Sequence, residues 1–497
     1  MRAAFAADPE DYELNKRVGM LLASNPNTRH RAEPFLIKAV NENRDEPERL
    51  ALLVAMAEVF EAAGAIEQEN QVLQFAADMS PAYYKDLAFS WFRLGEIDKA
   101  SDLFRHVIDG LYDLAKERAD QRGDEVTQLI WPNNVICSRF GELAHTVDVY
   151  VKARKLGLTP KVKAILTTED FRISNMALLE YWREQHADEI TILTDPADVA
   201  DAEKTFEDCG VCVDVYRVPG GRVLFIHQAT PAIWGAWEEA GREPLLKLRD
   251  DHRERGIQWL RDRGVPEDAW FAALHVRESG YHGESGWAYN VHRDSRLEDY
   301  FPAVKAITER GGWVVRIGDP SMPPLPPMEN VLDYAVATDR APELDVFFCA
   351  APRFMLGVTS GCIAVANVFG TPVLGVNMFP PGGYSYSGKD FYIHKLIRRR
   401  HDGKILDAAE MVVPPMRLMQ SPQYFENNGF EVIPNTPDEI REATGEMMLR
   451  LDGEFQVTEQ DLVNEAHYRE MSDFPGVPNP PTPCALFLRR YPELLGR

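Results

Sequence analysis

Hydrophobic residues in the first 110 positions recur at intervals of three and four, which is the spacing of an amphipathic helix. Glycines are few in this region, and no stretch alternates between apolar and polar residues as a half-buried strand does. Pro47 and Pro81 begin successive helical hairpins 34 residues apart, and Gly64 and Gly95 lie at their inner turns. The pattern therefore predicts a repetitive, all-α region at the start of the chain.

The second of these hairpins carries a more specific pattern. Trp91, Ala100 and Phe104 stand where small residues allow two helices to approach and aromatic residues fill the gap between them. With the 34-residue period, these positions resemble the tetratricopeptide repeat, and a poorer unit begins near Pro9. We expect about three such repeats, a number at which stacking becomes self-supporting. A generic helical bundle is the alternative.

After a polar boundary near residue 120, short apolar runs alternate with helical segments. This rhythm of strand, helix and strand implies parallel sheets with helices on both faces. The first series of expected strands comprises Val135–Cys137, Val162–Leu166, Glu189–Leu193, Val211–Tyr216 and Val223–Ile226. The second series comprises Trp270–His275, Trp313–Ile317, Phe354–Val358 and Pro372–Asn377.

The two series meet near residue 265, which predicts an α/β fold of two Rossmann-like lobes facing a cleft. The expected domains are helical repeats in 1–118, an N-terminal lobe in 125–262, a C-terminal lobe in 263–440, and a helical segment in 441–497 that packs back on the lobes. Ligands of such sheets bind at the carboxyl ends of the strands. Functional residues are therefore expected where the strands end.

Charge and cysteine content narrow the possible partners and location. The formal net charge of −24 argues against binding to nucleic acid or to an anionic membrane, although it allows one cationic pocket for a phosphorylated small molecule. No apolar run reaches the roughly 18 residues of a membrane helix, and the first residues do not resemble a secretory signal. Six cysteines form no disulfide framework, and the Cys209–Cys212 pair lacks the second pair that a zinc site needs. We expect a cytoplasmic protein with at most peripheral membrane contact.

The strongest local signal for ligand binding is the segment "FMLGVTSGCIAVANVFGTPVLGVN", from Phe354 to Asn377. A strand ends at Val358, and Thr359, Ser360 and Gly361 form the turn into a helix. Free backbone N–H groups at a helix start, with two hydroxyls and no Cβ at the glycine, suit a diphosphate. Tight packing between strand and helix, without any ligand, is the alternative.

Cationic residues at the ends of neighbouring strands strengthen the phosphate interpretation. Arg277 follows the strand that ends at His275, and its guanidinium can hold a pair of phosphate oxygens. Arg316 ends the next strand, where Gly318 and Asp319 follow. Each arginine alone could be a surface charge, and His275 alone could be structural, but together with the Thr-Ser-Gly turn they favour a phosphate pocket.

Two further groups carry candidate chemistry. In "FGELAHTV", Glu142 and His145 are three positions apart near a helix start and so share a face, from which a carboxylate could take a proton from an acceptor hydroxyl. Favourable placement of an acid in the field of the helix is the alternative. Arg293, in "HRDSRLEDYF", could contact the phosphorylated molecule in the pocket, or it could belong to a helix-capping network.

Three motifs resemble those of known glycosyltransferases, and the paired lobes resemble the GT-B fold. "FGELAHTV" is similar to the Gly-Asp-x-x-His-Thr loop of bacterial heptosyltransferases. The carboxylate of that loop is the catalytic base, and its position in the motif falls on Glu142. "TSGCIAVANVFGTPVLGVN" resembles the donor helix of the same enzymes, with Ser360 and Gly361 at matching positions, although Thr359 and Ala364 replace the motif's acid and histidine. "HVRESGYH" resembles the His-x-Arg motif of GDP-fucose-using fucosyltransferases, whose arginine holds the donor phosphate and falls on Arg277.

The best overall resemblance, over residues 125–497, is to a poorly characterised bacterial family of glycosyltransferases that are often fused to tetratricopeptide repeats. This resemblance implies a metal-independent, inverting transfer from a nucleoside-diphosphate sugar, with a GDP-sugar favoured, to a hydroxyl of a surface glycan, lipid-linked intermediate or protein. The nucleotide sugar is a co-substrate, and no cofactor is implied. Glu142 or His145 would be the base, and the helical repeats would bind a protein partner. A nucleotide-sugar epimerase of the same fold and a non-catalytic adaptor remain as alternatives.

Overall fold

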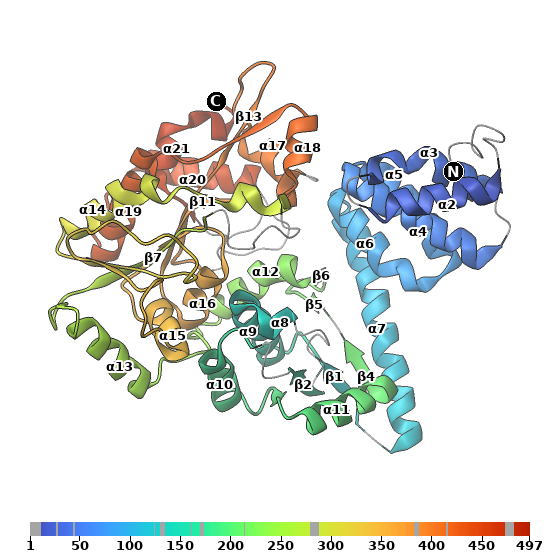
Figure 1. The fold of residues 1–497 in the computed structure, drawn as a ribbon, viewed down its shortest axis with the longest axis horizontal. Helices are drawn as coiled ribbons and strands as arrows, with labels where there is room; N and C mark the ends of the chain where they lie inside the picture. The colour runs from blue at the N-terminus through green and yellow to red at the C-terminus, as the bar shows by residue number, and fades with distance from the viewer. Residues whose placement is uncertain are drawn as a thin grey trace. The chain divides into compact units, whose positions relative to one another are not determined.

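The computed structural model describes residues 11–25, 28–42, 45–123, 125–129, 135–160, 162–168, 173–212, 214–278, 288–381, 387–413, 416–472 and 482–497. These residues fall into two compact units. The first contains the chain as far as Gly110, together with Arg222–Leu224 and Val413. The second contains the remainder, including both predicted lobes. Figure 1 shows the elements of each unit.

The first unit is built from helices, as the spacing of apolar residues predicts. Its helices are α2 (Tyr12–Ala23), α3 (Glu33–Glu42), α4 (Glu46–Ala63), α5 (Ile66–Met79), α6 (Tyr84–Arg93) and the first half of α7 (Ile97–Arg122), with short 3-10 turns at Arg29–Arg31 and Pro81–Tyr83. Helix α4 is capped by Asp45, whose carboxylate accepts from Glu48 N, and it ends at Gly64 with a left-handed φ of 71°. The assignment to tetratricopeptide repeats stays a prediction.

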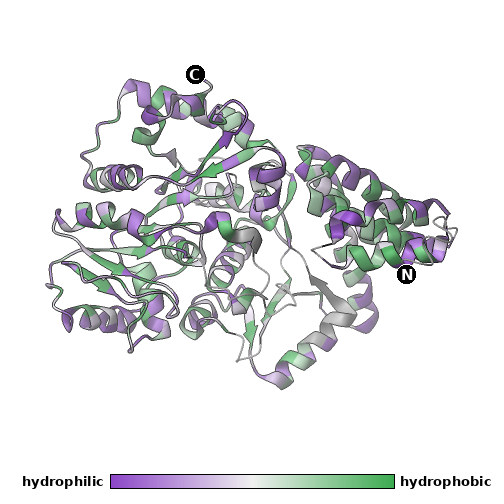
Figure 2. Cartoon of the chain, turned by 45° about the horizontal axis from the view of Figure 1, so that its top comes forward, coloured by the Kyte–Doolittle hydropathy of each residue, from purple (hydrophilic) through white to green (hydrophobic). Residues whose placement is uncertain are grey.

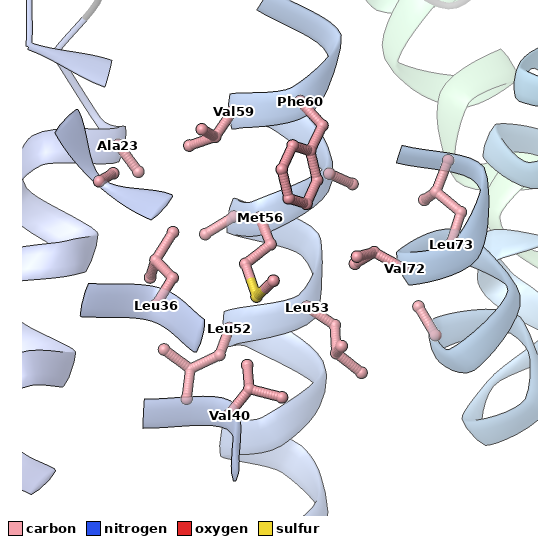
Figure 3. Close-up of a cluster of buried hydrophobic side chains, with 14 of the residues drawn as sticks. Ala23, Leu36, Val40, Leu52, Leu53, Met56, Val59, Phe60, Val72 and Leu73 are labelled. Carbon is pink, nitrogen blue, oxygen red and sulfur yellow. The ribbon is translucent and has the colours of Figure 1, made fainter. Parts of the chain in front are cut away.

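The core of the first unit lies between α3, α4 and α5. Leu36, Leu52, Phe60 and Leu73 are almost fully buried there, and Figure 3 shows their side chains converging from the three helices. In Figure 2 these helices carry both apolar and polar residues, as amphipathic helices do. Burial of such a face, rather than helix propensity, supplies most of the stability of helices of this length.

The second unit contains two parallel sheets, one in each predicted lobe. The smaller has four strands in the order β3-β2-β1-β4. Its strands are β1 (Thr127–Leu129), β2 (Lys163–Thr167), β3 (Thr191–Leu193) and β4 (Gly210–Cys212). The short strands β5 (Val215–Arg217) and β6 (Val223–Phe225) follow β4 along the chain. Helices α9 (Phe140–Lys155), α10 (Met176–Gln185), α11 (Pro196–Cys209) and α12 (Ile226–Glu239) alternate with the strands in sequence.

One predicted strand of this lobe is wrong. Val135–Cys137 belongs to the short helix α8 (Val135–Ser138), and the first strand of the sheet lies earlier, at β1. A run of three apolar residues fits a buried helical turn as well as a buried strand, and Ile136 and Cys137 are indeed buried. Phe140 and Gly141, which follow α8 closely in the chain, form the first turn of α9.

The larger sheet has seven parallel strands in the order β15-β12-β11-β10-β7-β8-β9. Its strands are β7 (Phe271–His275), β8 (Trp313–Arg316), β9 (Val331–Asp333), β10 (Met355–Gly357), β11 (Val373–Met378), β12 (Phe391–His394) and β15 (Thr482–Pro483). The four strands predicted for this lobe are present, while β9, β12 and β15 were not foreseen. Strand order reverses between β7 and β10, where a crevice forms at the carboxyl ends.

Helices cover the larger sheet and complete the chain. They are α13 (Asp250–Arg261), α14 (Phe301–Thr308), α15 (Pro342–Ala350), α16 (Gly361–Phe369), α17 (Ala408–Val412), α18 (Pro422–Asn427), α19 (Pro437–Asp452), α20 (Glu459–Met471) and α21 (Ala485–Arg490), with an antiparallel pair of strands, β13 (Leu396–Arg399) and β14 (Phe430–Ile433). Helix α19 packs on α14, and its buried Glu446 accepts backbone hydrogen bonds from Ala485 and Leu486 at the start of α21. The final segment is thereby anchored to the second lobe.

Candidate functional site

A cavity of about 470 Å³ is lined by residues of both lobes of the second unit. From the smaller lobe come the start of α9 and the start of α12, and from the larger lobe come the carboxyl ends of β7, β8 and β10. Ten residues singled out from the sequence line it: Glu142, His145, His275, Arg277, Arg293, Gly318, Asp319, Thr359, Ser360 and Gly361. Arg316 does not.

The first turns of α9 and α16 meet at this cavity. A Cβ added to Gly141 would lie 2.4 Å from the Cα of Gly361, and one added to Gly361 would lie 2.7 Å from the N of Gly141. Only glycine at both positions allows this approach. Because the first N–H groups of a helix lack partners within the helix and carry a partial positive charge, two helix starts at one point favour an anion.

The turn before α16 supplies further polar groups. Ser360 is the N-cap residue of α16, and its Oγ is buried without a hydrogen-bond partner among the described residues. Thr359 is fixed on both sides, because its Oγ1 accepts from Phe379 N at 3.1 Å and its carbonyl accepts from Arg293 Nη2 at 2.7 Å and Nε at 3.2 Å. Arg293 therefore holds the turn through the Thr359 carbonyl.

Arg277 is anchored at one end of its guanidinium. Its Nε donates to Asp294 Oδ1 at 2.9 Å, and within the described chain no acceptor contacts its Nη atoms. The buried Lys395 donates to the Asp294 carbonyl at 2.7 Å, and its pKa is lowered to about 8 by burial. Arg277 is thus a preorganised cation at the cavity wall.

Arg316 lies inside the protein instead. Its side chain is fully buried, and its guanidinium donates to Pro323 O at 2.7 Å, to Asp333 Oδ2 at 3.1 Å and to Glu278 Oε2 at 2.8 Å. A buried guanidinium needs such neighbours, since leaving its charge unpaired would cost several kcal/mol. The side chain ties the end of β8 to β9 and to the residue after Arg277, while Gly318 and Asp319 reach the cavity.

His275 is buried at the end of β7 and has a defined tautomer. Its Nδ1 lies 3.1 Å from the Ile317 carbonyl, which can only accept, so Nδ1 carries a proton. Burial by itself lowers the pKa of His275, but contact with Cys362 and the hydrogen bond to Ile317 outweigh it, so the pKa is raised. The second ring nitrogen faces Cys362.

On the opposite wall, Glu142 and His145 differ in their surroundings. Glu142 is half-buried, and its Oε2 accepts from Thr146 Oγ1 at 3.4 Å. His145 is buried, with Nε2 at 2.9 Å from Thr230 Oγ1, and Thr230 donates its own proton to Ile226 O at 2.7 Å. The His145 Nε2 therefore carries a proton, and burial, together with His227 and Lys152, lowers its pKa well below the ordinary value.

Several residues of the cavity wall were not foreseen. His227 is exposed and stacks on His145, with ring centroids 5.5 Å apart and planes 13° from parallel. Arg340 donates to Asp345 Oδ1 at 3.2 Å, and Cys349 and Cys362 lie on the same wall. A signal for His227 existed, because it directly follows an expected strand. No signal in the sequence indicated that Cys349 would lie beside the start of α16.

Three further expectations from the sequence concern metal ions, the pair of Cys209 and Cys212, and the membrane. Among the described residues, no three His, Cys, Asp or Glu side chains are grouped so as to hold a metal ion. The side chains of Cys209 and Cys212 lie outside the described residues. No helix in the described part of the chain is both long and apolar enough to cross a membrane.

Comparisons with known proteins found distant structural similarity alone. No family model matches the chain, and no curated protein sequence matches it. The chain is similar to the crystal structure of a glycosyl transferase family 9 protein from Veillonella parvula, with 10% identity, a TM-score of 0.38, and coverage of 66% of this chain and 98% of that one. It is also similar to ADP-heptose LPS heptosyltransferase II of E. coli, with 9% identity, a TM-score of 0.37, and coverage of 66% and 99%. Similarities of this size establish neither a shared family nor a shared substrate.

Proposed function

We propose that the second unit is a glycosyltransferase that moves a sugar from a nucleoside diphosphate to an acceptor hydroxyl. The observation that carries the proposal is the meeting of two helix starts, at Gly141 and Gly361, in a cavity that holds a carboxylate on one wall and a cation on the other. This arrangement provides a binding site for a negatively charged leaving group beside a candidate base.

The donor diphosphate occupies the wall formed by the larger lobe. Backbone N–H groups at the start of α16 and the Ser360 hydroxyl donate to its oxygens, and Arg277 pairs with its charge. Arg293 acts through Thr359, whose carbonyl it holds. Asp319 lies at the same cavity and can accept hydrogen bonds from hydroxyls of the donor. Arg316 has no part in binding, because its charge is already neutralised by two carboxylates.

In the reaction, the acceptor oxygen forms a bond to the anomeric carbon while the bond between that carbon and the phosphate oxygen breaks. The bonding electrons leave with the nucleoside diphosphate, whose growing charge Arg277 and the helix starts stabilise. Glu142 accepts the acceptor proton, since it is the half-buried carboxylate of the opposite wall. His145 already donates to Thr230 and has a lowered pKa, so it positions the stacked His227 and is not the base.

A single displacement of this kind inverts the anomeric centre, and arginine and helix starts supply the counter-charge without a metal. A GDP-sugar is the favoured donor, because "HVR" at the end of β7 resembles the His-x-Arg motif of GDP-fucose-using enzymes. The acceptor is a hydroxyl of a glycan, lipid-linked intermediate or protein. We also propose that the protein acts in the cytoplasm and that the helices of the first unit bind a protein partner.

The test uses the full chain. A thermal-shift panel of GDP, UDP, ADP, CMP and TDP should give one clear rise in Tm, since a ligand that binds the folded state stabilises it. Release of the same diphosphate from its sugar conjugates is then followed with and without glycan acceptors. Stabilisation by none of the nucleotides would overturn the donor site. Interconversion of a sugar nucleotide without any acceptor would overturn transfer in favour of epimerisation.

A further inference from the structure

Two cysteines and a histidine form a cluster that the proposed transfer reaction does not use. Cys362 is the second residue of α16, Cys349 lies near the end of α15, and His275 ends β7. All three line the cavity, and Cys362 is partly exposed there whereas Cys349 is buried. Three separate elements of the larger lobe therefore bring these side chains to one place.

The hydrogen bonds of the cluster run in one direction. His275 uses Nδ1–H for the Ile317 carbonyl, so Nε2 is the nitrogen that faces Cys362 and can accept its proton. The Cys349 thiol in turn donates a hydrogen bond to the Cys362 sulfur. Cys362 also lies in the first turn of a helix, where the N–H groups favour a negative charge.

These surroundings set Cys362 apart from the other described thiols. The pKa of Cys362 is lowered well below the ordinary value by the hydrogen bond from Cys349, against the effect of burial, and His275 and Arg340 lower it further. The pKa of Cys349 is raised by burial, as are those of Cys137 and Cys484. Thiolates rather than thiols are nucleophiles, so Cys362 combines charge with access to the cavity.

We propose that Cys362 is a modification site for peroxides and soft electrophiles, with His275 as the group that takes its proton and Cys349 as the resolving thiol. The Cys362 thiolate attacks one oxygen of hydrogen peroxide, the O–O bond breaks, and a sulfenic acid and hydroxide form, the hydroxide becoming water with the proton that His275 took from Cys362. The Cys349 sulfur then attacks the sulfenic sulfur, a disulfide forms, and water leaves. Two thiols are oxidised and one peroxide is reduced to two waters.

The position of this pair gives the modification a consequence within the cavity. Cys362 directly follows Gly361, the glycine that contacts the start of α9. A disulfide would tie α15 to this turn, and an alkyl group on Cys362 would occupy the cavity. The thiol chemistry itself does not depend on the proposed sugar transfer, and it is measured without any sugar nucleotide.

The first test measures alkylation of each cysteine in the reduced full chain by limiting iodoacetamide, using peptide mass spectrometry. At pH 6, Cys362 should react at least about tenfold faster than Cys137 and Cys484, because they remain protonated. From pH 6 to pH 8 its rate should rise less than about tenfold, whereas a thiol of ordinary pKa gains about a hundredfold. A Cys362 rate equal to that of Cys484, or a hundredfold rise with pH, overturns the proposal.

His275→Asn isolates the role of the histidine. The Asn amide keeps a donor near the Nδ1 position for the Ile317 carbonyl but lacks the nitrogen that faces Cys362. The Cys362 rate at pH 6 should fall at least about tenfold while the Cys137 rate is unchanged. An unchanged Cys362 rate in the variant contradicts the assignment of His275, and the wild-type measurement stands if the variant does not fold.

The second test adds hydrogen peroxide in slight excess and maps tryptic peptides without reduction. Arg353 separates the two cysteines, so the disulfide joins peptides 341–353 and 354–389. Cys484→Ser should form the same cross-link. Cys349→Ser should form none and instead yield a sulfenic acid on Cys362 that dimedone traps. Peroxide that leaves both thiols free in wild-type protein, or that joins Cys362 to another cysteine, contradicts the proposal.

Discussion

Gly141 and Gly361 place the backbones of two helix starts, from different lobes, in direct contact at the candidate site. The distance of 2.4 Å from a built Cβ on Gly141 to the Gly361 Cα leaves no room for even a methyl group. Because the obstacle is backbone rather than a flexible side chain, it cannot move without separating α9 from α16. The pair therefore joins the two lobes at the proposed diphosphate site.

Gly141→Ala should both destabilise the second unit and weaken nucleotide binding. We expect a loss of about 1–3 kcal/mol in the free energy of unfolding, which is typical of overpacking in a tight contact. Gly445→Ala is the matched control, since this helical glycine has nothing within 4 Å of a built Cβ and alanine favours a helix by about 0.5–1 kcal/mol. Urea unfolding of both variants checks the prediction, and equal stability of the two would contradict it.

Arg277→Ala should weaken binding of the nucleoside diphosphate by at least about tenfold, because hydrogen bonds to charged groups contribute about 1.5–3 kcal/mol each. Calorimetric titration with the nucleotide that stabilises the wild type gives the dissociation constant. Arg441→Ala, on an exposed face of α19, is the control and should bind as the wild type does. Undiminished affinity in Arg277→Ala would remove this cation from the proposed donor site.

Glu142→Gln should slow sugar transfer strongly without weakening the binding of the nucleotide donor. We expect kcat to fall by about 10²–10⁴, the usual contribution of a general base. Nucleotide affinity should be equal or higher, since the substitution removes a negative charge facing the diphosphate. Single-turnover product formation and calorimetric titration separate the two effects. Full activity in this variant would move the base to another residue of the cavity.

The buried pair of Asp148 and Lys152 on α9 should make stability depend on pH in two windows. The ammonium lies 2.9 Å from the carboxylate and over the Trp234 ring, and burial raises the pKa of Asp148 to about 6 and lowers that of Lys152 to about 8. Between about pH 4 and 6 the folded carboxyl holds its proton better than the unfolded one, so stability falls as pH rises. Between about pH 8 and 10 the unfolded amine holds its proton better, so stability rises.

Substitutions of this pair separate its effect from that of other groups. Asp148→Asn leaves a buried ammonium without its counter-charge and should cost about 3–5 kcal/mol, whereas Asp148→Leu with Lys152→Met together should cost little. Lys247→Ala, in an exposed ion pair with Glu243, is the control and should change stability by less than about 1 kcal/mol. Stability curves from pH 4 to 10 should lose both slopes in the double variant, and their persistence there would assign them to other groups.

The sequence by itself determined features that follow from local periodicity. Alternation of short apolar runs with helical spacing placed the strands at Trp270–His275 and Phe354–Val358, and therefore placed Arg277 and the Thr359–Gly361 turn at strand ends. Helical spacing in the first hundred residues predicted the helices there. Where a run was too short to distinguish the two periods, as at Val135–Cys137, the prediction failed.

Only the tertiary structure decided which side chains of these elements share one space. Arg277 and Arg316 look alike in sequence, yet two carboxylates draw one of them into the interior while the other faces the cavity. The contacts of Gly141 with Gly361 and of Cys349 with Cys362 join segments from different elements. Such pairings arise from packing of the whole chain, and no periodicity within a single helix or strand records them.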